Sequence, residues 1–444
     1  MNANLLSATE AAKAIRDGLI TSEELVGACL ARIDEVEGTV QAWTHLNANH
    51  ALEQARVLDE RRVQGLALGP LHGIPVGIKD IIDTKDFPTE NGTPLHAGRQ
   101  PGHDATVVSL LREAGAVILG KTVTTELAVM HPGKTTNPHN PAHTPGGSSS
   151  GSAAAVAAGM VPLAVGSQTN GSTIRPASFC GIYGFKPTFA RISRHGVLKQ
   201  SDPLDTIGVF GRTLEDVSLL ADALIAYDDR DESMVPLARP GISSVMAEEP
   251  PVTPHIAFVR TPKWDMAEEE TKDGLRELMD HLNQNGTVVD ILDLPSLFDE
   301  AHEMHRRLME GDLAKSFARE YAEGKDHLSA IMVEMIERGQ KVTDAEYDEA
   351  MKCRDICIGM LNAFFEDYDA ILTPAVPGAA PEGLDATGSP VFCTIWTFTG
   401  MPALSLPVLE GRDGLPVGAQ LVGQQNDDGR LLRTARWMMR TLED

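Results

Sequence analysis

Short apolar segments alternate with amphipathic segments along most of this chain, and that alternation limits the folds that it can adopt. Ile74–Ile78 and Val161–Val165 are typical of short buried strands. Leu214–Leu224 has the apolar spacing of a helix with one buried face. Strands that alternate with helices predict an α/β fold. We therefore expect a single large domain over residues 1–444, with a mixed, twisted β-sheet core covered by helices on both faces.

The same order continues in the second half of the chain, from a strand at Ile256–Val259 to a terminal helix at Gly429–Thr441. One segment, at about residues 228–254, is acidic, rich in proline and loosely patterned, which is typical of a surface connection. We expect it to join two parts of one domain, because no flexible linker separates two self-sufficient cores.

The charge of the chain argues against some classes of function. The formal net charge at pH 7 is −25 over 444 residues, whereas a nucleic-acid groove needs a basic face. No secretory signal and no uninterrupted apolar run of about 18 residues is visible, so a membrane span is not predicted. The five cysteines are scattered and odd in number, which favours a reducing compartment. We therefore expect a cytoplasmic protein with no nucleic-acid or membrane partner.

Two Gly/Ser-rich clusters, Pro145–Ser152 and Gly166–Ser172, flank an Ala-rich apolar run at Ala153–Val165. They concentrate small hydroxyl groups and unhindered backbone N–H groups, which are needed to attack a carbonyl and to hold the resulting oxyanion. Ser172 follows a predicted strand closely enough to sit on a tight turn, and the N–H groups of Thr169–Gly171 form a nest for an oxyanion. Ser172 is therefore the candidate nucleophile.

A serine nucleophile needs a base, and Lys79 is the candidate. It lies in the apolar stretch Leu71–Ile82, which predicts that its side chain is buried. Burial disfavours the charged form of a lysine and lowers its pKa, so that a neutral amine is available to accept the serine proton. The hydroxyls of Ser148–Ser150 are candidates for relaying that proton.

Two other motifs compete with this interpretation. Gly147–Gly151 matches the nucleophile-elbow pattern, which would make Ser149 the nucleophile of a Ser-His-Asp hydrolase. That fold needs a downstream acid and then a histidine, and no later histidine lies in a strand-end loop with a clear acidic partner. Gly115–Thr122 matches the phosphate-binding pattern Gly-x-x-x-x-Gly-Lys-Ser/Thr. A phosphate cradle needs a strand before its first glycine, and a helix is predicted there.

The chain resembles the amidase signature family. The segments that carry the resemblance are Lys79, Pro145–Ser152, Gly166–Pro187, Leu204–Gly208 and Gly414–Gly423. The likeness is specific in the Gly/Ser clusters and weaker toward both ends, and it covers nearly the whole chain. It implies the amidase signature fold, with a signature core at about residues 65–212.

The resemblance also implies a Ser-cisSer-Lys triad. In such a triad Ser172 is the acyl-accepting nucleophile, Ser148 is the bridging serine in a cis peptide, and Lys79 is the terminal base. The spacing between the two serines agrees with the family pattern. The implied oxyanion hole consists of the N–H groups of Thr169, Asn170, Gly171 and Ser172.

The chain departs from the commoner family pattern at three positions. Gln168 stands where Asp is usual, Asn170 replaces a Gly, and Arg175 lies three residues after the nucleophile instead of two. The Gln and the Ile-Arg-Pro order resemble a malonamidase-like branch, in which the arginine is suited to a substrate carboxylate. A structural ion pair with an acidic neighbour is an equally good interpretation of Arg175, and both stay open here.

The resemblance implies acyl transfer in two steps from a small-molecule amide to water, with no metal or cofactor. We expect an amidohydrolase, with esters, anilides and carbamates as further candidate substrates. The alternative is the amidase subunit of a glutamine-dependent tRNA amidotransferase, although such subunits normally keep the Asp and the double Gly that are replaced here. If the chain associates, a homodimer is the first expectation.

Several side chains are expected to contact or support the substrate. They are Ser149, Arg175, Met130, Gln168, Ile174 and Trp396. Cys353 and Cys357 share a predicted helix face, but without a nearby Cys/His pair they are better interpreted as buried helix residues than as metal ligands.

Overall fold

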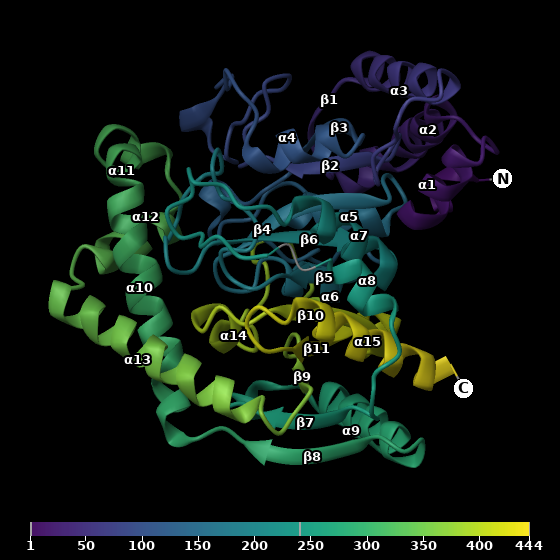
Figure 1. Ribbon diagram of the computed structural model, residues 1–444. Helices are drawn as coiled ribbons and strands as arrows, with labels where there is room; N and C mark the ends of the chain where they lie inside the picture. Colours follow the sequence, from purple (N-terminus) through teal and green to yellow (C-terminus); the bar gives the residue numbers. More distant parts are fainter. Residues whose placement is uncertain (1, 239–240, 444) are drawn as a thin grey trace.

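A computed structural model of the protein describes residues 2–238 and 241–443 (Figure 1). Residues 239 and 240, inside the expected surface connection, and residues 1 and 444 of the expected domain lie outside the described residues. The strands are β1 (Trp43–Leu46), β2 (Pro75–Lys79), β3 (Val117–Thr122), β4 (Leu163–Gln168), β5 (Tyr183–Lys186), β6 (Thr206–Gly211), β7 (His255–Arg260), β8 (Val288–Asp293), β9 (Ala370–Pro374), β10 (Ala403–Glu410) and β11 (Pro416–Val422). The helices are α1 (Ala8–Arg16), α2 (Ser22–Val40), α3 (Ala48–Val63), α4 (Thr106–Glu113), α5 (Ser150–Ala157), α6 (Ile174–Phe179), α7 (Leu214–Leu224), α8 (Ile242–Ala247), α9 (Glu269–Gln284), α10 (Ala301–Ser316), α11 (Ala318–Gly324), α12 (Ala330–Gly339), α13 (Asp344–Phe364), α14 (Thr394–Phe398) and α15 (Asp428–Glu443).

The strands form one mixed sheet of 11 strands, in the order β1-β3-β2-β4-β6-β5-β10-β11-β9-β7-β8. β2 pairs in parallel with β3 and β4, and β7 pairs in parallel with β8 and β9, whereas the other neighbours are antiparallel. In Figure 1 the C-terminal strands β10 and β11 lie between the N-terminal strands and β7–β8. Since a single sheet joins both halves of the chain, the predicted single-domain α/β fold is confirmed.

Helices cover both faces of the sheet, because successive side chains of a strand point to opposite faces. In β4, Leu163 and Val165 belong to an apolar cluster with residues of α1, α4 and α7. Ala164, between them, belongs to a second cluster with residues of α3 and α5. Helices also cover the sheet at β9, where Ile371 packs in a cluster with residues of α10 and α13. None of the helices within the described residues is long and apolar enough to cross a membrane.

The acidic segment at about residues 228–254 is less loose than we expected. Asp228 is buried and accepts hydrogen bonds from the hydroxyls of Thr106 and Ser193. Asp231, also buried, forms an ion pair with Arg194 at 2.7 Å. The segment also contains α8, which packs against α7 and α15. The described part of this segment is therefore docked on the domain through partners that are distant in sequence.

Two glycines make room for the serine-rich loops on the sheet. Gly166 of β4 and Gly208 of β6 are paired in register. A Cβ atom on Gly166 would press on the side chain of Ser149, and one on Gly208 would overlap the hydroxyl of Thr173. Because neither glycine has a side chain, both loops lie directly against the sheet.

We predict that Gly208→Ala lowers the free energy of unfolding by about 1–3 kcal/mol, because the added methyl group displaces Thr173. The matched control is Gly359→Ala on α13, where nothing lies within 4 Å of the added atom. That substitution should raise stability by about 0.5–1 kcal/mol, since Ala is the better helix former. Urea unfolding followed by circular dichroism measures both, and equal effects of the two substitutions would contradict the expectation.

Candidate active site

Lys79 ends β2, an interior strand of the sheet, and its side chain is completely buried. Its Nζ is hydrogen-bonded to Ser148 Oγ at 2.7 Å and to Ser167 Oγ at 2.8 Å. Burial lowers the pKa of Lys79 well below its usual range, and Asp205 opposes this effect while Arg175 adds to it. Burial therefore favours the uncharged form of the amine, which has two hydroxyls as its partners.

Ser148 lies in the loop before α5, and the peptide bond between Gly147 and Ser148 is cis. The Ser148 carbonyl accepts a hydrogen bond from the Thr125 N–H at 3.2 Å. The Gly147 carbonyl accepts two from Arg175, from Nε at 3.2 Å and from Nη2 at 2.6 Å. Both peptide groups around Ser148 are therefore held in place, which fixes its hydroxyl beside Lys79.

The turn at residues 169–172 joins β4 to α6 and presents free N–H groups. The Thr169 carbonyl accepts a hydrogen bond from the His305 imidazole at 2.9 Å. The Asn170 carbonyl accepts one from the Thr397 hydroxyl at 2.6 Å. By contrast, none of the N–H groups of residues 169–172 donates to any of the described residues. Fixed N–H groups without partners are suited to hold an oxyanion.

Ser172 stands on this turn and is nearly buried, with 7% of its surface exposed. Its hydroxyl makes no hydrogen bond to the part of the chain that is described. The structure therefore brings Lys79 and Ser148 together, and it places Ser172 on the turn without a hydrogen bond to Ser148. Hydrogen bonds between catalytic groups are often long in free enzymes and shorten when substrate binds.

Gln168, one of the departures from the common family pattern, supports the turn from inside the fold. Its Oε1 accepts hydrogen bonds from the N–H groups of Thr173 at 2.9 Å and Ile174 at 3.1 Å, at the start of α6. Its Nε2 donates to the Thr397 hydroxyl at 2.9 Å. Gln168 thus satisfies helix-terminal N–H groups, as a capping carboxylate would, and its expected contact with substrate stays a prediction.

Arg175 is buried, and its hydrogen bonds go to backbone carbonyls. Besides its two bonds to the Gly147 carbonyl, its Nη1 donates to the Gly388 carbonyl at 2.7 Å. No acidic side chain among the described residues forms an ion pair with it. Burial lowers its pKa to about 10. In this structure it holds two peptide carbonyls and forms no ion pair with the described acidic residues, and its contact with a substrate carboxylate stays a prediction.

The remaining residues expected near the substrate divide into two groups. Ser149, Ile174 and Trp396 are fully buried. The Ser149 hydroxyl donates to the Ser167 carbonyl and accepts from the Ser167 N–H, both at 3.2 Å, and it contacts no imidazole in the described chain. These contacts argue against Ser149 as the nucleophile. Contacts of Ser149, Ile174 and Trp396 with a substrate stay predictions. Met130 is partly exposed and packs beside an apolar cluster that includes residues of α10 and α12.

A cavity of about 280 Å³ reaches the site beside Ser167, Thr169 and Asp205. Asp205 accepts hydrogen bonds from the Thr169 hydroxyl at 2.7 Å and from the Gln200 N–H at 2.8 Å. Reasoning from the sequence missed Ser167 and Asp205. The available signals were the place of Ser167 in the second Gly/Ser cluster and the place of Asp205 in Leu204–Gly208.

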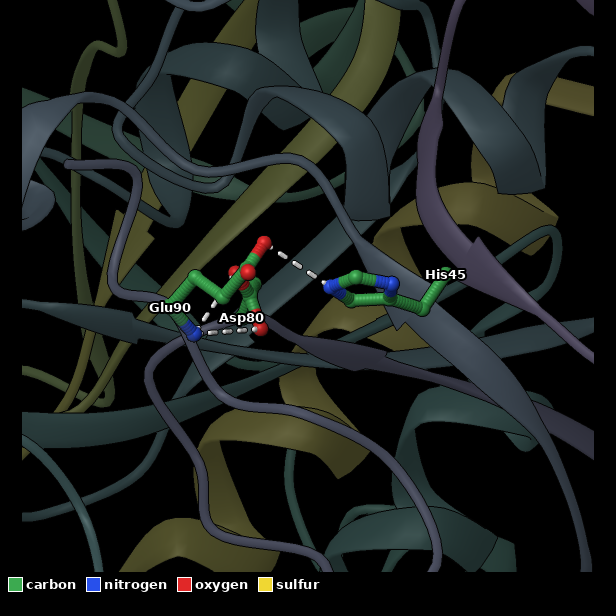
Figure 2. A group of neighbouring side chains, drawn as sticks. All are labelled: His45, Asp80 and Glu90. Carbon is green, nitrogen blue, oxygen red and sulfur yellow. Dashed lines mark hydrogen bonds and ion pairs between the residues drawn. The ribbon is translucent and has the colours of Figure 1, made fainter. Parts of the chain in front are cut away.

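His45, Asp80 and Glu90 form a second group of polar side chains, and their potential ligand atoms lie within 4.8 Å of one another (Figure 2). His45 Nε2 lies 3.0 Å from the Glu90 carboxylate, and the Glu90 N–H donates to Asp80. The buried ammonium of Lys121 lies 3.1 Å from Asp80. Because a lysine already balances the buried carboxylate, this group needs no metal ion to explain it.

The ion pair of Lys121 with Asp80 also argues against the phosphate-binding interpretation of Gly115–Thr122. Most of that motif is strand β3 inside the sheet, and no flexible loop separates its two glycines. Lys121 also donates to the Thr89 hydroxyl at 2.6 Å. The motif therefore offers neither an open loop nor a free lysine to a phosphate.

Known proteins with similar sequences include subunits of amidotransferases. A family model described as Amidase matches residues 24–432. A glutamyl-tRNA(Gln) amidotransferase subunit of Rhodopirellula baltica is 34% identical, over 97% of this chain and 95% of its own length. The protein of the same name from Chloroflexus aurantiacus is 34% identical, over 99% of this chain and 97% of its own length.

Solved structures extend the similarity to the fold. Peptide amidase from Stenotrophomonas maltophilia has a TM-score of 0.85 and 27% identity, over 99% of this chain and 97% of that chain. A chain from a vestigial complex, described as revealing the origins of an s-triazine catabolic enzyme, has a TM-score of 0.92 and 26% identity, over 98% of each chain. Together with the family match over nearly the whole sequence, these likenesses show that the chain belongs to the amidase signature family.

Proposed function

We propose that the protein cleaves carboxylic amides through Ser172, with Ser148 and Lys79 as the path for its proton. The observation that carries the proposal is the buried lysine amine 2.7 Å from the Ser148 hydroxyl, beside a turn whose N–H groups are free. An uncharged amine can accept a proton, and fixed N–H groups stabilise the negative charge that develops on the attacked carbonyl.

The proposed reaction has two steps. Ser172 Oγ attacks the amide carbon while its proton moves to Ser148, and the Ser148 proton moves to Lys79. The C–N bond then breaks, and the leaving amine takes a proton from Ser148, which regains one from Lys79. Water attacks the acyl-enzyme along the same path and restores the Ser172 hydroxyl. Ser172, Ser148 and Lys79 account for every proton transfer in this scheme. The absence of a metal or cofactor stays a prediction.

A second candidate function has specific support. The relatives from Rhodopirellula baltica and Chloroflexus aurantiacus bear the name of a tRNA-dependent amidotransferase subunit, and this chain spans nearly their whole length. On sequence comparison alone, that name favours a subunit that supplies ammonia to a partner over a free-standing hydrolase. Gln168 and Asn170 are the departures that favour the hydrolase. Both functions use the same amide cleavage, and they differ in substrate and in the need for a partner.

The two candidates make opposite predictions for the isolated chain. A free-standing amidohydrolase should release ammonia or amine from members of a panel of small amides and anilides, without any added protein. An amidotransferase component should release little ammonia from any amide, glutamine included, until it is joined to its partner. An enzyme-coupled ammonia assay, with product amines measured by chromatography, distinguishes these outcomes.

Ser172→Ala should abolish both amide turnover and covalent labelling by a fluorophosphonate, since the attacking oxygen is gone. Ser149→Ala should still be labelled, although more slowly, because it keeps the Ser172 oxygen and loses only the support that the Ser149 hydroxyl gives to the Ser167 backbone. Intact-mass spectrometry after incubation with the probe measures both. Labelling of the Ser172→Ala protein, or loss of labelling only in Ser149→Ala, would assign the nucleophile elsewhere.

Lys79→Met should reduce turnover by about 10²- to 10⁴-fold, which is the usual contribution of a general base. The pH profile gives a second measurement. Burial lowers the pKa of Lys79, so the amine is uncharged above that pKa and gains a proton as the pH falls through it. Activity should therefore decline on the acid side of the profile. A profile for Lys79→Met that keeps the same acid decline would show that another group titrates.

The finer expectations of the sequence analysis stay predictions. They concern esters and carbamates as substrates, a homodimer, a cytoplasmic location and the absence of nucleic-acid and membrane partners. The substrate amide and its binding surface are to be found by experiment, since the cavity beside Ser167 and Thr169 is not lined by Ser172.

A further inference from the structure

We propose that Ser167 is a positioning residue that orients the Lys79 amine toward Ser148. This inference rests on the proposed function, and it adds a residue to which the triad pattern gives no role. Ser167 Oγ lies 2.8 Å from Lys79 Nζ, as close as the 2.7 Å contact of the triad itself. Among the described residues these two hydroxyls are the hydrogen-bond partners of the amine.

The valence of an uncharged amine makes the second partner important. A neutral lysine has two N–H groups and one lone pair, and only the lone pair can accept the proton of Ser148. An N–H group that donates to Ser167 is turned away from Ser148. The contact with Ser167 therefore limits rotation about the last C–N bond and keeps the lone pair directed at the hydroxyl that delivers the proton.

Ser167 is itself held firmly on two sides. On one side β4 pairs with β6, with Ser167 opposite Ile207. On the other side the Ser149 hydroxyl satisfies both the N–H and the C=O of Ser167. Ser149 thus takes the place of a neighbouring strand where β2 has ended. A chain of contacts from Ser149 through Ser167 to Lys79 fixes the amine.

Oxygen atoms near Ser167 favour an orientation of the Lys79 amine in which its N–H groups, and not its lone pair, point toward Ser167. Ser167 borders the cavity that also touches Thr169 and Asp205. The Asp205 carboxylate is the charge that opposes the lowered pKa of Lys79. Oxygen atoms on this side draw the amine hydrogens and leave the lone pair to Ser148. The Ser167 hydroxyl hydrogen has no acceptor among the described residues, so it is free to point into the cavity.

Ser167→Val and Ser167→Thr form a matched pair for the test, because the two side chains have the same shape and only Thr keeps the hydroxyl. The cavity beside Ser167 gives room for the added methyl group. The measurement is fluorophosphonate labelling of the purified chain across a range of pH, with the limiting rate separated from the half-saturating probe concentration. This probe needs no knowledge of the natural substrate.

Ser167→Val should lower the limiting rate about 10- to 100-fold and change the half-saturating concentration by less than about threefold. The acid limb of the pH profile should also move down by about half to one pH unit. The sign follows because an ammonium donates a stronger hydrogen bond to Ser167 than an amine does, so losing the acceptor lowers the pKa of Lys79 further. Ser167→Thr should keep the rate within about threefold and restore the acid limb.

Thr206→Val is the control for the cavity wall. Thr206 lines the same cavity, and among the described residues its hydroxyl donates a hydrogen bond to the Leu204 carbonyl alone. We expect this variant to label at the rate of the unchanged protein. If urea unfolding shows that Ser167→Val is not folded, Ser167→Ala takes its place, with the same expected losses, since it is smaller than serine.

Equal losses in Ser167→Val and Ser167→Thr, or a loss without a shift of the acid limb, would show that Ser167 only fills space and would overturn the inference. Unchanged labelling of Ser167→Val would overturn it as well. If Ser172→Ala and Lys79→Met are inactive while Ser167→Val is active, only this inference fails. If Ser172→Ala remains active, the proposed function fails first.

Discussion

Burial of the Lys79 amine is the constraint that decides which groups can surround it. Burial disfavours an ammonium, and a carboxylate in direct contact would restore it. The partners of Lys79 are instead the hydroxyls of Ser148 and Ser167. Asp205 is close enough to affect the pKa of Lys79, yet its oxygens accept bonds from Thr169 and from backbone N–H groups. The charge balance around the lysine therefore favours a base over a salt bridge.

Peptide groups near the lysine are fixed by side chains that never face solvent. Arg175 holds the Gly147 carbonyl, and its positive charge also lowers the pKa of Lys79. Gln168 holds the first N–H groups of α6. Such groups are already oriented before a substrate arrives, so little reorganisation is needed when charge develops. Two of the three departures from the common family pattern, Gln168 and Arg175, therefore hydrogen-bond to backbone groups in this structure.

Features that depend on residues close in sequence could be predicted, whereas contacts between residues that are distant in sequence could not. Leu214–Leu224 was predicted with the bounds that α7 has, because apolar spacing is a local signal. The burial of Lys79 was likewise visible in its apolar neighbours. β5 and β6 were not predicted, because glycines interrupt their apolar pattern. The partners of Arg175 could not be foreseen, since Gly388 lies 213 positions away and offers only a carbonyl.

The contacts of the turn at residues 169–172 have a consequence for how the protein is made. Its carbonyls are held by His305 and Thr397, and Arg175 is held by Gly388. All three partners are translated long after the serines they support. A nascent chain that already contains every member of the proposed triad therefore still lacks the supports of the turn. The proposed site should therefore be complete only late in synthesis, once the last third of the polypeptide has left the ribosome and packed against this turn.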